Sequence, residues 1–232
     1  MRQKTTDAMR AAILDGVLKP GQKLSERELC ESLDVSRSCI RESLQHLQAE
    51  GLVNIVLHRG PEVASIDAEE VRDIYAVRMS LESLVVSGFV VHASAEQKQA
   101  IRACVGRLEQ EVTVGGAARL VAIKSDFYDI LIEGCGNSVV GQVLRQMNNR
   151  VTVLRRASMA RPGRSLEAAK ELAALVQAIE AGNSVRAVDL CNEHLRNACA
   201  NALEAMQANI ASRGESEDEA VKTDPGSSVT AG

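Results

Sequence analysis

The chain has 232 residues, of which 45% are hydrophobic, and a formal net charge of −4, so it is long enough for two small domains with buried cores. Aromatic residues make up only 2% of the sequence and tryptophan is absent, which argues against single-stranded nucleic-acid binding, because that binding depends on aromatic stacking. No apolar run reaches the roughly 18–20 residues that cross a membrane, the first ten residues are polar, and the six cysteines form no CxxC pair, so we expect a cytoplasmic protein.

Residues 1–66 predict a small domain of three helices followed by a β-hairpin. A capping box, Ser25-Glu-Arg-Glu28, starts the second helix, and Ser36 caps a third helix that stops at Gly51. Two short helices with a tight turn between them have the spacing of a helix-turn-helix, and the hairpin adds a wing. The elements that we expect are a helix over about residues 5–15, helices ending near residues 33 and 50, and β-segments at about 53–56 and 62–65.

The third helix has two different faces. Ile40, Leu44 and Leu47 recur at helical spacing and predict its buried face. Toward the start of the helix, the opposite face carries polar side chains: Arg37, Ser38, Arg41 and Gln45. Arginine and glutamine suit guanine and adenine edges in the major groove, and recognition helices meet bases near their N-termini. The alternative is a solvated basic face, which the capped helix before it and the wing after it make less favoured.

Residues 67–210 predict an antiparallel bundle of about six helices, so the whole chain is expected to be mainly α. Capping boxes at Asp67-Ala-Glu-Glu70 and Ser94-Ala-Glu-Gln97, with glycine-asparagine pairs at 136–137 and 182–183, mark helix ends. The expected helices cover about residues 67–92, 94–111, 117–136, 138–159, 165–181 and 184–210. Residues 211–232 are acidic and lack periodic apolar positions, so we expect a disordered tail.

Two polar residues fall on apolar faces of these expected helices. Arg78 lies within the stripe to which Ile74 and Val85 belong. It either snorkels or pairs with a structural acid, or it forms a fixed fork for the carboxylate or phosphate of a ligand. His194 lies on an apolar face of the last helix, where a lone histidine is more often a satisfied core residue than a ligand.

Six stretches of the first domain follow the sequence pattern of one family: Ile13-Leu-Asp-Gly16, Leu18-Lys-Pro-Gly21, Leu24-Ser-Glu-Arg-Glu-Leu29, Val35-Ser-Arg37, Arg41-Glu-Ser-Leu44 and Ala49-Glu-Gly-Leu-Val53. On these stretches, residues 8–66 resemble the DNA-binding domain of the GntR family of bacterial regulators. The resemblance implies four DNA contacts, and the helix face and wing tip add four candidates: Arg27, Arg37, Arg41 and Gly60, then Ser38, Gln45, His58 and Arg59. Arg27 and Arg41 would hold phosphates and Arg37 a base. Cys39 stands where the family usually has proline.

Landmarks in residues 67–208 follow the pattern of a second domain: Ile74-Tyr-Ala-Val-Arg78 with Leu81-Glu82, the stretch from Phe127 to Asn137, Ala178-Ile-Glu-Ala-Gly-Asn183, and Glu193-His-Leu195. They resemble the FCD domain of FadR-type regulators. The expected count of six helices, rather than seven, is similar to that of the shorter, VanR-like branch of this domain. The resemblance implies a homodimer that binds double-stranded operator DNA. A small-molecule effector in the bundle would change the spacing of the two DNA-binding domains.

Many regulators of this type hold a divalent cation on one aspartate and three histidines of the bundle. The landmarks place Lys124, Tyr128 and Leu172 at three of these positions, and only the last histidine is kept, as His194. A stable zinc site normally needs three or more ligands, so we expect no metal and no other cofactor. Lys124 either supplies the positive charge for an anion or reaches solvent. The candidate effector residues are Arg78, Lys124, Tyr128, Arg150 and His194.

Sequence motifs of enzymes are missing from the chain. It has no HExxH, no glycine-rich phosphate loop and no nucleophile elbow, so we do not expect an enzyme. We expect a DNA-binding transcriptional regulator, a repressor whose operator affinity is modulated by a small anionic metabolite. The alternative is a metal-responsive regulator of the same family with a divalent cation in the helical domain.

Overall fold

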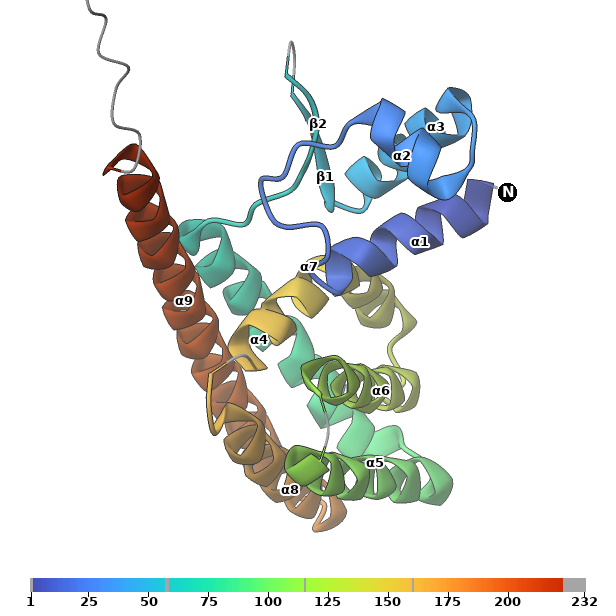
Figure 1. Ribbon diagram of the computed structural model, residues 1–232. Helices are drawn as coiled ribbons and strands as arrows, with labels where there is room; N and C mark the ends of the chain where they lie inside the picture. Colours follow the sequence, from blue (N-terminus) through green and yellow to red (C-terminus); the bar gives the residue numbers. More distant parts are fainter. Residues whose placement is uncertain (1, 57–58, 115, 160, 223–232) are drawn as a thin grey trace, which may run out of the picture.

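The computed structural model describes residues 2–56, 59–114, 116–159 and 161–222, without the side chains of residues 114, 117 and 209–222. The predicted wing residue His58 and residues 223–232 of the predicted tail lie outside this range. The described chain has nine helices and one two-stranded sheet (Figure 1). A small unit of three helices and the sheet sits above a bundle of six helices in the figure, which confirms the predicted mainly α fold.

The N-terminal unit contains α1 (Arg2–Leu14), α2 (Glu26–Leu33), α3 (Arg37–Ala49), β1 (Val53–Val56) and β2 (Gly60–Val63). The hydroxyl of Ser25 accepts a hydrogen bond from the backbone N–H of Glu28, which caps α2. The hydroxyl of Ser36 accepts one from the backbone N–H of Cys39, so the cap of α3 forms without the usual proline. Asp34 ends α2 in the left-handed conformation (φ 50°) and turns the chain into α3.

The core of this unit lies between α1, α3 and the sheet. Ile40, Leu44 and Leu47 are buried there, as the periodicity predicts. The two strands pair antiparallel with Val53 opposite Val63, and both of these valines join the same core. Because a one-residue slip would turn both valines to solvent, this register fixes the wing beside α3.

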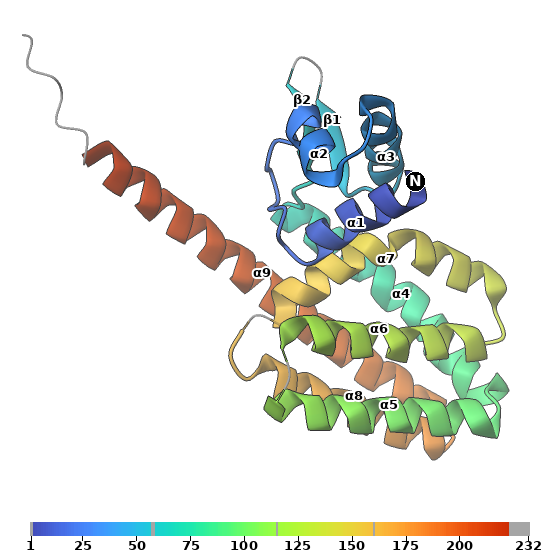
Figure 2. The ribbon, with the colours of Figure 1, turned by 45° about the vertical axis from the view of Figure 1, so that its right-hand side comes forward.

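The bundle contains α4 (Ala68–His92), α5 (Ala95–Val114), α6 (Ala117–Gly134), α7 (Ser138–Met159), α8 (Arg164–Glu180) and α9 (Ser184–Lys222). The predicted helix ends agree within three residues except at the C-terminus. There α9 continues to Lys222, so residues 211–222 are helical and the expectation of disorder is wrong for them. This stretch contains alanine, glutamate and lysine, which favour helix, and it contains no proline. Figure 2 shows the end of α9 projecting away from the bundle.

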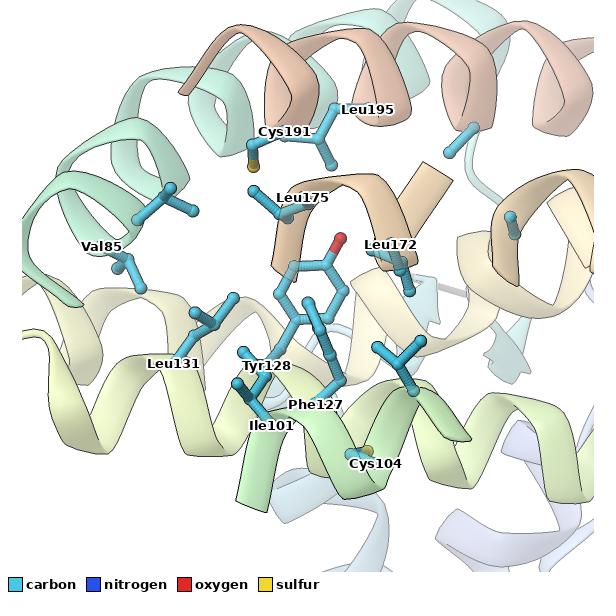
Figure 3. Close-up of a cluster of buried hydrophobic side chains, with 14 of the residues drawn as sticks. Val85, Ile101, Cys104, Phe127, Tyr128, Leu131, Leu172, Leu175, Cys191 and Leu195 are labelled. Carbon is cyan, nitrogen blue, oxygen red and sulfur yellow. The ribbon is translucent and has the colours of Figure 1, made fainter. Parts of the chain in front are cut away.

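Helix α4 lies in the middle of the bundle and packs against α6, α7 and α9. Among the described helices it is the one whose length and composition would let it cross a membrane, contrary to the expectation from apolar runs, and 44% of that window is buried. It carries Arg78 and Glu82 near its middle, and both side chains are buried inside the fold. Figure 3 shows its Val85 facing apolar side chains of α6, α8 and α9. We therefore interpret α4 as the central helix of the bundle.

Helix α7 joins the bundle to the N-terminal unit, and α1 lies across it (Figure 2). The guanidinium of Arg156 donates to the backbone carbonyl of Leu14 at 2.9 Å. The amide of Asn149 donates to Glu50 at 2.8 Å, and the same carboxylate pairs with Arg10 of α1. These contacts hold both α1 and the end of α3 to one face of α7.

The close approach of α4 to the end of α6 gives a stability prediction. A Cβ added to Gly88 would lie 2.3 Å from the carbonyl oxygen of Cys135. We expect Gly88→Ala to lower the free energy of unfolding by about 1–3 kcal/mol, because one of two packed backbones must move. The matched control is Gly106→Ala on α5, where nothing lies within 4 Å and the change should be neutral or stabilising by up to about 1 kcal/mol. Urea unfolding followed by circular dichroism measures both, and equal effects would contradict this packing.

Candidate functional site

The predicted polar face of α3 is fully presented to solvent. All four of its predicted side chains are exposed: Arg37, Ser38, Arg41 and Gln45. The opposite face is buried to at least 98%, since Ile40, Leu44 and Leu47 retain 0–2% of their exposure. Burial of the apolar stripe therefore orients the polar side chains outward along the first two turns of the helix.

Two of the predicted arginines have acidic partners on the surface. The Nε of Arg41 donates to both carboxylate oxygens of Glu26, at 2.9 and 3.0 Å. Arg27 pairs with Glu31 at 3.5 Å, one turn away on α2. Exposed pairs of this kind stabilise a fold by at most about 1 kcal/mol, so a phosphate can replace the carboxylate. In the described part of the chain Arg37 has no hydrogen bond or ion pair, and its side chain is exposed to solvent.

The wing carries two further candidates. Arg59 is exposed and lies directly before β2. Gly60 has a φ of 83°, a conformation that favours glycine, and no atom lies within 4 Å of the position where a Cβ would be. Another molecule can therefore approach the backbone at Gly60 closely.

The bundle contains a second group of polar side chains, which are buried or half-buried between its helices. This buried polar cluster consists of Tyr75, Arg78 and Glu82 of α4, Lys124 and Tyr128 of α6, Arg155 and Ser158 of α7, Arg164 and Glu171 of α8, and His194, Asn197 and Asn201 of α9. Removing a charge from water costs several kcal/mol unless a partner compensates it. The pairing inside the cluster therefore decides what it can do.

Two guanidinium groups of the cluster have carboxylate partners. The Nε of Arg78 donates to Glu82 at 2.7 Å, one turn along α4. Both terminal nitrogens of Arg164 donate to the two oxygens of Glu171, at 2.7 Å each. Burial lowers the pKa of Arg78, but the charge and hydrogen bond of Glu82, together with the neighbouring Tyr128 and Tyr75, outweigh burial and the pKa is raised. For Arg78 the alternative of pairing with a structural acid is therefore confirmed.

Lys124, His194 and Glu171 form a chain of contacts from α6 through α9 to α8. The Nζ of Lys124 lies 3.2 Å from Nε2 of His194, and Nδ1 of His194 lies 2.5 Å from Glu171. Burial, and then the neighbouring Lys124, lower the pKa of His194 to about 3. A neutral imidazole therefore donates through Nδ1 to Glu171 and accepts from Lys124 at Nε2. Burial raises the pKa of Glu171, but hydrogen bonds from His194, Arg164 and Asn197 bring it down to about 2.

Two cations of the cluster have no carboxylate partner of their own. Burial, and then Arg155 and Arg164, lower the pKa of Lys124 well below its usual range. Arg155 lies over the ring of Tyr128, with its Cζ 4.4 Å from the ring centroid, and its Nη1 donates to Ser125 at 3.1 Å. Burial, and then the charge of Arg78, lower the pKa of Arg155 as well.

Seven buried polar atoms of the cluster have no hydrogen-bond partner among the described residues: Tyr75 Oη, Arg78 Nη1, Glu82 Oε2, Tyr128 Oη, Arg155 Nε, Ser158 Oγ and Arg164 Nε. Each such atom costs about 1–3 kcal/mol, and buried polar groups are normally satisfied. A cavity of about 20 Å³ borders Glu82, Tyr128 and Arg155, which is room for about one water. Six of the seven atoms can donate, so the cluster suits an acceptor-rich, anionic ligand.

The structure brings together four of the five predicted effector residues: Arg78, Lys124, Tyr128 and His194. Of the two alternatives for Lys124, the one in which it reaches solvent is wrong, because only 2% of the residue is exposed. The prediction for Arg150 is also wrong in its placement. The side chain of Arg150 is 44% exposed, pairs with Glu70 at the start of α4 at 2.9 Å, and lies against Gly51 of the N-terminal unit.

Four charged members of the cluster were missed by sequence reasoning: Glu82, Arg155, Arg164 and Glu171. The spacing of four residues between Arg78 and Glu82 is a signal that could have found Glu82. Arg155 and Arg164 gave no such signal, since their partners lie on other helices or on a later turn.

The residues at the positions where related bundles hold a metal do not fit one. Lys124 directs its ammonium group at His194, the one imidazole among the four positions, and an ammonium repels a cation. Leu172 is apolar and fully buried. In the described part of the chain, no three histidine, cysteine or carboxylate side chains gather where they could hold a metal ion. A ligand at these four positions would therefore interact with Lys124 instead of a metal ion.

Comparison with known proteins matches both parts of the chain. Residues 73–197 match the family described as "FCD domain", and residues 1–63 match "Bacterial regulatory proteins, gntR family". The HTH-type transcriptional regulator YdhC of Bacillus subtilis is 26% identical over 62% of this chain and 64% of its own length, just under two thirds. The HTH-type transcriptional repressor GlaR of Escherichia coli is 24% identical over 85% of this chain and 93% of its length. A transcriptional regulator GntR from Rhodococcus sp. RHA1 has a similar structure, with a TM-score of 0.73, 25% identity and coverage of 88% of this chain and 98% of that one.

The buried imidazole gives a prediction about pH. The pKa of His194 is about 3 in the folded chain and about 6.5 in an unfolded one, so unfolding takes up a proton between these values. The free energy of unfolding therefore falls as the pH decreases from about 6.5 toward 3. We expect the Tm to fall between about pH 7.5 and 5.5, and to fall less in His194→Gln, whose amide does not titrate. Thermal melts at constant ionic strength measure this. The exposed His92→Gln is the control, and equal slopes for His194→Gln and the wild type would contradict a neutral His194.

Proposed function

Because the chain belongs to the GntR family of bacterial regulatory proteins and carries an FCD domain, it is a DNA-binding transcriptional regulator, and we propose that it is a cytoplasmic repressor controlled by a small anion. The anion binds in the buried polar cluster and changes the affinity of the N-terminal unit for operator DNA. The observation that carries the effector proposal is the set of buried donors without partners. The resemblance to GlaR over most of both chains supports repression.

In this proposal α3 enters the major groove and Arg37 contacts a base. Its guanidinium is exposed near the N-terminus of α3 and forms no ion pair with a described residue. Arg27 and Arg41 already have carboxylate partners on the surface, a geometry that suits exchange for backbone phosphates. Gly60 and Arg59 of the wing lie where the backbone can approach DNA.

We propose that two copies of the chain bind one short palindrome. Val77, Leu84 and Val91 follow one another at seven-residue spacing along α4, and their exposed fractions are 44%, 55% and 70%. Side chains at this spacing share one helix face, and an exposed apolar stripe is stabilised when a second copy covers it. One recognition helix covers only a few base pairs, so a two-fold axis doubles the sequence that is read.

We propose that α7 connects the effector site to the DNA-binding unit. Arg155 faces the buried polar cluster, and the next residue, Arg156, donates to the carbonyl of Leu14 at the end of α1. The cavity beside Arg155 has room for about one water, so a metabolite enters only if the surrounding side chains and helices move. A shift of α7 would change the support of α1 and, through Asn149, of Glu50 at the end of α3.

The first prediction concerns base reading. We expect Arg37→Ala to weaken operator binding by about 1–3 kcal/mol and to reduce the ratio of operator to random-DNA affinity. Arg27→Ala should weaken binding to both kinds of DNA and flatten the salt dependence, because a phosphate contact is independent of sequence. The operator is obtained by selection from a random duplex library, and affinities are measured by fluorescence anisotropy at several salt concentrations. An unchanged affinity ratio in Arg37→Ala would show that another residue reads the bases.

The second prediction concerns the effector and its coupling to DNA. In a thermal-shift screen of small organic acids, we expect at least one to raise the Tm of the full chain and to weaken operator binding. Arg156→Ala should keep this rise in Tm but reduce the effect of the acid on DNA affinity. Arg102→Ala, which removes an exposed pair with Glu180 between α5 and α8, is the matched control. If no acid shifts the Tm, the effector proposal fails, and if Arg156→Ala responds like the control, the role of α7 is wrong.

A further inference from the structure

The charges of the buried polar cluster identify the class of effector, an inference that rests on the effector site proposed above. We infer that the ligand is a dianion, a short dicarboxylate with one carboxylate at Arg155 and the other at Lys124. The structure contains two buried cations that the chain itself does not compensate, and they belong to neighbouring positions of one site.

The other buried charges of the cluster already form pairs. Glu82 accepts from Arg78 at 2.7 Å, and Glu171 accepts from both terminal nitrogens of Arg164. Glu171 also accepts from Nδ1 of His194 and from Asn197, so its oxygens are occupied by three partners. The two carboxylates therefore balance two of the four cations. Oε2 of Glu82 has no hydrogen bond among the described residues and borders the same cavity as Arg155, but the charge of Glu82 is already shared with Arg78.

Arg155 is the first uncompensated cation. It is 95% buried, and its described contacts are the hydroxyl of Ser125 and the face of the Tyr128 ring, neither of which carries a negative charge. Its Nε has no partner among the described residues. Asp129 and Arg145 border the same cavity, but both are exposed and opposite in charge. A guanidinium with a free donor aimed into a closed site is suited to a carboxylate.

Lys124 is the second buried basic side chain without a carboxylate partner. It is 98% buried, and its one hydrogen-bond partner among the described residues is Nε2 of His194 at 3.2 Å. His194 is neutral and is held by Glu171, so the imidazole positions the lysine without cancelling its charge. Because burial and the neighbouring arginines hold the pKa of Lys124 well below its usual range, its ammonium form needs a negative charge beside it. A ligand with one negative charge would serve Arg155 or Lys124 but not both. A dianion compensates both.

The positions of the two cations limit the length of the ligand. Lys124 and Tyr128 are one turn apart on α6, about 6 Å along the helix axis, and Arg155 sits on the ring of Tyr128. The same guanidinium reaches Ser125, the neighbour of Lys124. Carboxylates this close together occur in four- to six-carbon dicarboxylates such as succinate, glutarate and adipate. The hydroxyls of Tyr75 and Tyr128, which have no partner in the described chain, would donate to their oxygens.

The test compares ligands of equal length and different charge on the full chain. Succinate, glutarate and adipate are each measured against the matching monomethyl ester by isothermal titration calorimetry and thermal shift at constant ionic strength. We expect at least one dicarboxylate to bind tenfold or more tightly than its monomethyl ester. We expect Lys124→Gln, which keeps a donor for His194 but loses the charge, to reduce this preference to less than threefold. Arg107→Ala, which removes an exposed pair with Asp126, is the control and should keep the full preference.

The outcomes separate this inference from the effector proposal. Monoanions that bind as tightly as the dianions would overturn the dicarboxylate inference while the anionic effector stands. If neither class binds, the proposed effector site itself is wrong. A full preference in Lys124→Gln would overturn the assignment of the second carboxylate. Should Lys124→Gln not fold, Arg155→Lys and Arg155→Gln replace it, with the preference expected to survive in the first and to fall in the second.

Discussion

The cost of removing charge from water is the constraint on which the bundle depends. Five helices each contribute at least one polar or charged group to the same interior. Helix α8 supplies Glu171, which holds Arg164 of its own helix and His194 of α9, and His194 in turn meets Lys124 of α6. Because each of these groups is costly when it stands alone, the helices must keep the register that pairs them. Figure 3 shows buried apolar side chains of the same helices, among them Leu172 of α8 and Leu195 of α9, which are the sequence neighbours of Glu171 and His194.

Sequence patterns predicted the elements well because the relevant forces are local. The hydroxyls of Ser25 and Ser36 cap α2 and α3 through contacts three residues away, so the sequence alone contains both partners. The same holds for the face of α3, where the period of Ile40 and Leu44 determines which side is buried. The end of α9 was missed because acidic composition suggested disorder, although the described helix continues to Lys222.

The interior of the bundle could be predicted only in part. Arg78 and His194 stand on apolar stripes, so periodicity turns them inward, and Lys124 was found through its place relative to a family landmark. Periodicity does not tell which of Arg155 and Arg150 faces the interior of the bundle. Both lie on α7 among polar residues, and which of them faces the bundle is decided by the N-terminal unit packing on the other side. That information lies in contacts between segments about a hundred residues apart in the sequence.

The opposite directions of Arg155 and Arg156 have a consequence for how this helix can diverge among relatives. Consecutive helical residues point about 100° apart, so the assignment of one to the bundle and the next to α1 depends on the rotational phase of α7. Substitutions elsewhere on its exposed surface leave that phase unchanged. An insertion or deletion of a single residue upstream within α7 would rotate both arginines away from their partners at once. Natural variation in this helix should therefore conserve its residue count more strictly than its composition.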